Sequence, residues 1–164
     1  MKHVLFLCTG NSARSVIAEG LLRHLGAANF TAHSAGSKPT GTPNPAAIAV
    51  LQANGIDTSF ARSKSWDEFA APCDHEIDIV ITVCGNAADE TCPIWPGAPI
   101  SAHWGVEDPA DVIAPAEAVA AAFAKTYDQM HQRITAFLAL DHNQDENLYR
   151  QALQRIGKID AQSD

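Results

Sequence analysis

An apolar segment at the start of the chain leads into a short loop and a helical pattern, and this arrangement leaves few folds open. Residues 2–8 (KHVLFLC) are apolar throughout their middle, which is typical of a strand covered on both faces. Over residues 14–25, apolar side chains recur at helical spacing, with Ser12 or Ser15 available as the cap and Gly26 as the stop. The pattern predicts a buried parallel strand, a tight loop and a helix.

Strands and helices alternate along the rest of the chain. The predicted strands are 29–34, 77–83 and 98–103, and the predicted helices are 45–54 and 114–140. This order implies an α/β three-layer sandwich, a four-stranded parallel sheet with helices on both faces and a ligand crevice at the carboxyl ends of the strands. We expect a single domain over 1–140, then a polar C-terminal extension over 141–164 with one short helix, 146–156, and no evident role.

Composition narrows the functions that are open to the chain. Its 164 residues suit one domain with its own core, and the start of the sequence lacks the apolar length of a leader or a membrane span. We therefore expect a soluble, cytoplasmic protein with no membrane partner. The formal net charge of −8 and the lack of any Lys/Arg cluster argue against a nucleic-acid partner. Four cysteines without an export signal indicate reactive or metal-binding thiols.

The loop after the first strand has the residues of an oxyanion site. Backbone N–H groups between a strand and a helix form an anion nest, and Gly10 allows the tight path that this requires. The same field lowers the pKa of Cys8 and makes it a nucleophile, while Arg14 can grip two oxygens in its planar fork. Ser15 can donate to the thiolate and Asn11 can hold the loop from within. The predicted oxyanion-binding residues are Thr9, Gly10, Asn11, Ser12, Ala13, Arg14 and Ser15.

The sequence also leaves other roles for the cysteines to be weighed, and it offers Asp108 as a second catalytic group. A lone cysteine at the end of a strand is usually a buried hydrophobe, but the residues around Cys8 favour chemistry. Asp108 precedes a proline after the fourth predicted strand, so it could act as a general acid or simply form an Asp-Pro turn. Structural zinc is disfavoured because the four possible ligands have irregular spacing, without a C-x2-C knuckle: Cys73, Cys84, Cys92 and His103.

At this point the sequence resembles a known family, the low-molecular-weight protein tyrosine phosphatase fold, and more closely the arsenate reductases built on it that draw electrons from thioredoxin. The resemblance covers about residues 2–139. It is carried by CTGNSARS (8–15), AEG (18–20), HSAGS (33–37), DIVITVC (78–84), CP (92–93) and HWGVEDP (103–109).

The resemblance implies a three-thiol relay that reduces arsenate to arsenite. Cys8 attacks arsenate, Arg14 and the loop amides hold its oxygens, and Asp108 protonates the departing oxygen. Cys84 then attacks Cys8 to release arsenite, and Cys92 attacks Cys84 to leave a disulfide for thioredoxin or another dithiol donor. Phosphate and sulfate would compete as oxyanions. Cys84 and Cys92 could instead be two buried structural thiols, and Cys73 has no counterpart in the motif.

The resemblance also implies a metal site and shows two departures. No cofactor is required, but many relatives bind potassium beside the loop, and the matching positions are Asn11, Glu19, Ser34 and Asp67. Some relatives carry a further cysteine where this chain has Ala13. The seven residues between Cys84 and Cys92 are one more than usual, which leaves the thiol donor open.

Two other functions stay open on sequence grounds. A tyrosine phosphatase would use the same Cys8, Arg14 and Asp108, but it usually carries aromatic residues after Asp-Pro, and here Ala110, Asp111 and Val112 follow. A non-enzymatic redox sensor would bind an oxyanion and form disulfides without turnover. An arsenate reductase is itself expected to show weak phosphatase activity, because arsenate and phosphate have similar shape and charge.

Overall fold

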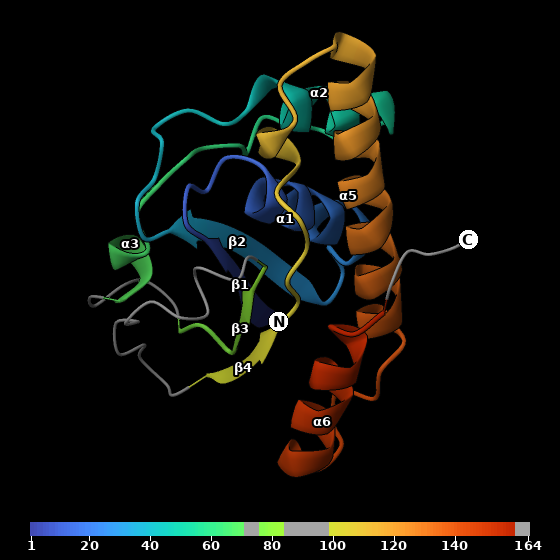
Figure 1. Ribbon diagram of the computed structural model, residues 1–164. Coiled ribbons are helices and arrows are strands. Elements are labelled where there is room, and N and C mark those ends of the chain that lie inside the picture. The colour runs from blue at the N-terminus through green and yellow to red at the C-terminus, as the bar shows by residue number, and fades with distance from the viewer. Residues whose placement is uncertain (71–75, 84–98, 160–164) are drawn as a thin grey trace.

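The protein folds around one parallel sheet. The computed structural model describes residues 1–70, 76–83 and 99–159. Its four strands pair in the order β2-β1-β3-β4, all parallel, and run over Lys2–Cys8 (β1), Phe30–Gly36 (β2), Ile79–Thr82 (β3) and Ile100–His103 (β4) (Figure 1). The α/β fold with a four-stranded parallel sheet is therefore confirmed.

Strand β1 lies inside the sheet and is buried from both sides, as its unbroken apolar run predicts. Val4, Phe6 and Cys8 face one core cluster, while Leu5 and Leu7 face another. This alternation follows from the two-residue period of a strand. Both faces of β1 are therefore buried, and the strand stays buried to its carboxyl end at Cys8.

Helices cover both faces of the sheet (Figure 1). On one side lie α1 (Arg14–Leu25), α2 (Pro45–Ala53) and α5 (Ala116–Leu138), which contact one another. On the other side lies the short α3 (Asp67–Ala70), whose Phe69 packs in the cluster of Leu5 and Leu7. The periodicity did not predict α3 or the 3-10 helix η1 (Pro109–Asp111), because elements of three or four residues are too short to show a repeat.

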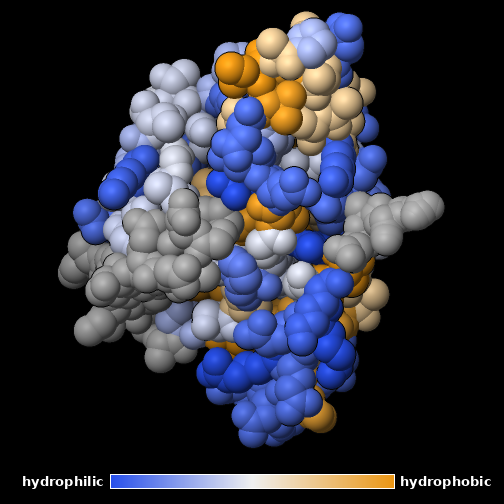
Figure 2. All heavy atoms as spheres, viewed as in Figure 1, coloured by the Kyte–Doolittle hydropathy of each residue, from blue (hydrophilic) through white to orange (hydrophobic). Residues whose placement is uncertain are grey.

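The tail that follows residue 140 contains α6 (Glu146–Ile156), with the bounds that its sequence pattern predicts. Trp104, fully buried after β4, donates its indole N–H to the Leu153 carbonyl over 2.9 Å. Arg133 of α5 donates to the carbonyls of Trp104 and Ile159. The described part of the tail therefore shares the core of the preceding residues, while its outward face is mainly hydrophilic (Figure 2). Within the described ranges, no helix combines the length and apolarity needed to cross a bilayer.

A histidine joins the tail to the core. The His142 ring packs against Phe30, Phe137 and Tyr149, and its Nδ1 lies 2.6 Å from the Tyr149 hydroxyl. Burial lowers the pKa of His142 below its ordinary value of 6.5, and the nearby charge of Lys2 acts in the same direction. The folded protein therefore favours the neutral ring.

We expect the free energy of unfolding to fall on acidification from about pH 7 to about pH 5. The lowered pKa makes the contribution of His142 complete above 6.5 and lost as the pH falls through the folded-state value. Urea unfolding across this range should show a shallower pH dependence for His142→Gln than for the wild type. His24→Gln, at an exposed position of α1, should keep the wild-type slope. An unchanged slope in His142→Gln would contradict the assignment.

Candidate active site

Cys8 is the last residue of β1 and is 3% exposed. Its Sγ lies 2.9 Å from the Oγ of Ser15, a fully buried residue in the first turn of α1. A hydroxyl in this position can donate to a thiolate, which stabilises negative charge on the sulfur. The structure thus brings together the predicted nucleophile and its predicted hydrogen-bond donor.

In the loop from residue 9 to residue 13, three carbonyl oxygens point toward a neighbouring segment of the chain. They accept backbone N–H groups from the segment after β2: Lys38 to Thr9, Thr40 to Gly10 and Asn44 to Ser12, over 2.9, 3.0 and 2.9 Å. In a trans peptide the N–H points opposite to the carbonyl of the same unit. The N–H groups of Gly10, Asn11 and Ala13 therefore face the other way, which is the arrangement of an anion nest.

Asn11 holds the loop from within, as its sequence position suggests. Its backbone is left-handed, with φ of 47°, a conformation that asparagine tolerates well. Its fully buried side-chain amide donates to Ser15 Oγ and to Ser34 Oγ, both over 2.9 Å. The amide oxygen accepts the Lys64 backbone N–H over 2.9 Å. One side chain therefore links the loop to α1, β2 and the segment before α3.

The start of α1 differs from the prediction in one respect. The N-cap is Ala13 and no side chain caps the helix, so the expectation of a Ser12 or Ser15 cap is wrong. Ser15 cannot be the cap, because it already belongs to the helix. Its hydroxyl faces Cys8 instead. Helix N–H groups without a capping side chain, at the positive end of the helix dipole, favour an anion at this position.

Arg14 and Asp108 meet across the site. An Arg14 terminal nitrogen donates to the Val106 carbonyl over 3.1 Å, and the other lies 3.3 Å from Asp108 Oδ2. The side chains of Arg14 and Asp108 are 14% and 33% exposed. Asp108 Oδ1 accepts the Ala110 N–H over 3.0 Å and caps η1, so the residue forms an Asp-Pro turn and also faces Arg14. The structure therefore places the predicted acid beside the predicted oxyanion-binding arginine.

The three remaining cysteines, Cys73, Cys84 and Cys92, lie outside the described residues. Val83, the residue before Cys84, is fully buried, and its N–H donates to the Leu7 carbonyl over 2.8 Å. The chain leading to Cys84 therefore runs beside the residue that precedes Cys8. His103, considered above as a zinc ligand, has its Nδ1 2.7 Å from Thr82 Oγ1.

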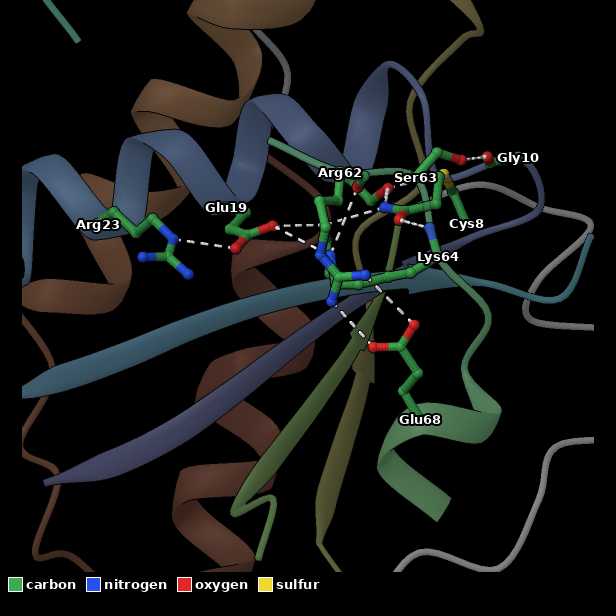
Figure 3. Close-up of polar contacts among 11 residues, drawn as sticks. Cys8, Gly10, Glu19, Arg23, Arg62, Ser63, Lys64 and Glu68 are labelled. Atoms are coloured by element: carbon green, nitrogen blue, oxygen red, sulfur yellow. Dashed lines mark hydrogen bonds and ion pairs between the residues drawn. The ribbon is translucent and has the colours of Figure 1, made fainter. Parts of the chain in front are cut away.

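Beside the loop, Glu19 of α1 is buried among polar partners. It accepts Ser34 Oγ–H over 2.5 Å and Arg23 Nε–H over 2.9 Å, and the Lys64 ammonium lies 3.9 Å from its Oε1 (Figure 3). Burial raises the pKa of Glu19, opposed by Lys64, Ser34 and Arg23. Burial lowers the pKa of Lys64, opposed by Glu19. Both charges are thus costly to bury and depend on each other.

The structure gathers three of the four residues that the resemblance suggested for potassium. Asn11, Ser34 and Glu19 form one hydrogen-bonded row. Asp67 is exposed at the first residue of α3, where its N–H binds Ser65 Oγ. Over residues 1–70, 76–83 and 99–159, no group of three or more His, Cys, Asp or Glu side chains is placed to hold a metal ion. The sequence interpretation missed Lys64, since an isolated lysine in a polar loop ordinarily indicates a solvated surface.

The position of Gly36 beside the loop leaves no room for a side chain. It pairs with Cys8 in the sheet, and a Cβ on it would press on the Thr9 carbonyl oxygen and lie 2.9 Å from the Cys8 oxygen and 3.0 Å from Asn11 N. All three are backbone atoms at the end of β1 and in the loop, so they cannot move aside without deforming the site. Only the absence of a side chain lets β2 and the loop approach this closely.

We expect Gly36→Ala to weaken phosphate binding at least about tenfold and to cost about 1–3 kcal/mol of stability, because the added methyl displaces the loop. Isothermal titration with phosphate and urea unfolding measure the two effects. Gly55→Ala is the control: it introduces backbone strain at φ of 75°, but its Cβ meets nothing within 4 Å. The control should lose stability and keep phosphate affinity. Wild-type affinity in Gly36→Ala would contradict the role assigned to this glycine.

Comparison with known proteins agrees with this geometry. A family model described as low molecular weight phosphotyrosine protein phosphatase matches residues 3–155. An arsenate reductase from Bacillus licheniformis is 40% identical over 137 residues, 83% of this chain and 94% of the relative. A solved arsenate reductase in an intermediate state has a TM-score of 0.66 and 31% identity, covering 85% of this chain and 98% of that one. A tyrosine phosphatase from Erwinia amylovora has a TM-score of 0.64 and 19% identity, covering 85% and 94%, and shares the fold.

The chain belongs to the low molecular weight phosphotyrosine protein phosphatase family. Within that family it is similar to the arsenate reductases. The resemblance stated from its motifs is therefore confirmed.

Proposed function

We propose that the protein reduces arsenate to arsenite. The observation that carries the proposal is the strand–loop–helix unit that holds Cys8 against Ser15 and, at the far end of its loop, pairs Arg14 with Asp108. The chain is also 40% identical to an arsenate reductase. In the first step, the Cys8 thiolate displaces one arsenate oxygen. Arg14 and the loop amides hold the remaining oxygens, and Asp108 supplies a proton so that the oxygen leaves as water.

The reduction itself needs two electrons, which thiols supply by forming a disulfide. Cys84 attacks Cys8 Sγ, the sulfur–arsenic bond breaks, and its electron pair stays on arsenic, which leaves as arsenite. Cys92 then attacks Cys84 and releases Cys8 as a thiolate. A dithiol donor of the thioredoxin kind reduces the resulting Cys84–Cys92 disulfide. Support for these later roles comes from the sequence motifs, and Val83 beside Leu7 agrees with them.

The proposal includes the partners and setting of the reaction. Phosphate and sulfate should compete with arsenate, because the loop and Arg14 recognise a tetrahedral oxyanion. The relay requires reduced thiols, so it suits the cytoplasm. No resident cofactor is needed for any of the steps above, since all electrons pass through cysteine sulfur.

A coupled assay tests the function. With thioredoxin, thioredoxin reductase and NADPH present, the wild type should oxidise NADPH in an arsenate-dependent way over many turnovers. Mass spectrometry of the trapped protein should show the disulfide intermediates. Rapid hydrolysis of aryl phosphates without arsenate-dependent oxidation would replace the proposal by a phosphatase. Disulfide formation without turnover would leave only a redox sensor.

The phosphatase is the second candidate, because the matched family is a phosphatase family. A phosphatase would use the same Cys8, Arg14 and Asp108 as nucleophile, oxyanion-binding arginine and acid. The residues after Asp108 weigh against it as the main activity. The helix η1, Pro109–Asp111, contains no aromatic side chain that could hold a phosphotyrosine ring. We therefore expect only slow hydrolysis of aryl phosphates.

A further inference from the structure

Lys64 is placed beside the catalytic loop by contacts at its backbone and at its side chain. Its N–H donates to Asn11 Oδ1 and its carbonyl accepts the Gly36 N–H, both over 2.9 Å. Its side chain is 7% exposed and ends 3.9 Å from Glu19 Oε1 (Figure 3). The backbone contacts fix the position of the Lys64 main chain, and the Glu19 carboxylate fixes the position of its ammonium group.

The row of residues suggested for potassium does not fit a metal ion well. A hard cation needs several oxygen ligands directed at it. The Asn11 oxygen is already used by the Lys64 N–H, so the amide presents its NH₂ group to Ser34 and Ser15. Asn11 therefore turns donors, and no oxygen, toward the two hydroxyls.

Charge leads to the same conclusion. Glu19 already has two cationic partners, Arg23 at 2.9 Å from Oε2 and Lys64 at 3.9 Å from Oε1. Ser34 directs its proton at Oε1 as well. A potassium ion here would face an ammonium group in a buried site, where like charges repel strongly.

We propose that the Lys64 ammonium is the built-in cation of this site, in place of the potassium ion that the resemblance suggested, and that Lys64 acts as a positioning residue for the loop. The connection runs through Glu19, Ser34 and Asn11. Because the Asn11 NH₂ group donates to both serines, Ser34 is left to donate to Glu19 and Ser15 to the Cys8 sulfur. The catalytic consequence rests on the proposed role of Cys8, but the test needs no arsenate.

The wild type gives the first test. Its Tm and the pH profile of Cys8 alkylation by iodoacetamide, followed by peptide mass spectrometry, are measured in potassium chloride and in tetramethylammonium chloride at equal ionic strength. Both quantities should be the same in the two salts. A Tm that rises saturably with potassium, and not with tetramethylammonium, would overturn the proposal.

Lys64→Ala gives the second test, because it removes the charge and opens space for an ion. Its Tm should fall by about 10 °C, and its Cys8 alkylation profile should move to higher pH. Potassium should restore at least about half of the lost Tm and shift the profile back, whereas tetramethylammonium should not. Equal responses to the two salts would contradict a cation site.

Three further variants make the result specific. Lys64→Arg keeps the charge, so it should stay close to wild-type Tm and ignore potassium. Lys64→Gln is the milder neutral variant if Lys64→Ala does not fold, and it must show the same shift of the alkylation profile. Lys125→Ala removes an exposed lysine paired with Glu107 and should behave as the wild type. A normal alkylation profile in both neutral Lys64 variants would refute the positioning role.

Discussion

Cys8→Ser should abolish arsenate-dependent NADPH oxidation, with a fall of about 10⁴-fold or more in rate. A serine hydroxyl is not ionised near neutral pH and cannot form a disulfide, so both the attack on arsenate and the electron transfer fail. Serine is close to cysteine in size and can keep a hydrogen bond to Ser15, so the fold should survive. The coupled assay measures the loss, and an unchanged circular dichroism spectrum confirms the fold.

The other cysteines divide the reaction into steps. Cys84→Ser should stop after one covalent adduct, and Cys92→Ser after one turnover, both quantified by arsenite release per mole of protein. Cys73→Ser is the matched control and should turn over like the wild type. Multiple turnover by Cys92→Ser with thioredoxin would rule out the three-thiol relay and leave Cys8 and Cys84 as the working pair.

Arg14→Lys should lower kcat/KM for arsenate about 10³-fold. The planar guanidinium contacts Val106 O and Asp108 Oδ2 through different nitrogens, so it can present two donors at fixed spacing, whereas lysine is a single point charge. Phosphate affinity should fall in parallel, because ground-state oxyanion binding uses the same fork. Arg150→Lys, in an exposed pair with Glu146 on α6, should change neither quantity. Retained kcat/KM in Arg14→Lys would show that charge alone suffices.

Local patterns predicted the elements that surround the nucleophile. The bounds of β1, α1 and α6 match the expected 2–8, 14–25 and 146–156, because each has a complete apolar repeat and a clear stop. Strand β3 is shorter than the expected 77–83, because its parallel pairing covers only Ile79–Thr82. Strand β4, Ile100–His103, ends where the pattern predicts. The predicted serine cap of α1 was wrong, because the helix begins at Arg14 and its N-cap position is Ala13. Ser15 lies inside the helix and faces Cys8.

The sequence by itself determined the strand–loop–helix unit, with Cys8 and Arg14 at the two ends of its loop, because the spacing within one short segment decides that geometry. Only the tertiary structure decided which distant residues complete the site. The order β2-β1-β3-β4 brings Asp108, after β4, to Arg14. The approach of β2 to the loop depends on Gly36, and the segment before α3 directs Lys64 at Glu19. These contacts arise from strand order and close packing, which a local repeat of apolar residues does not encode.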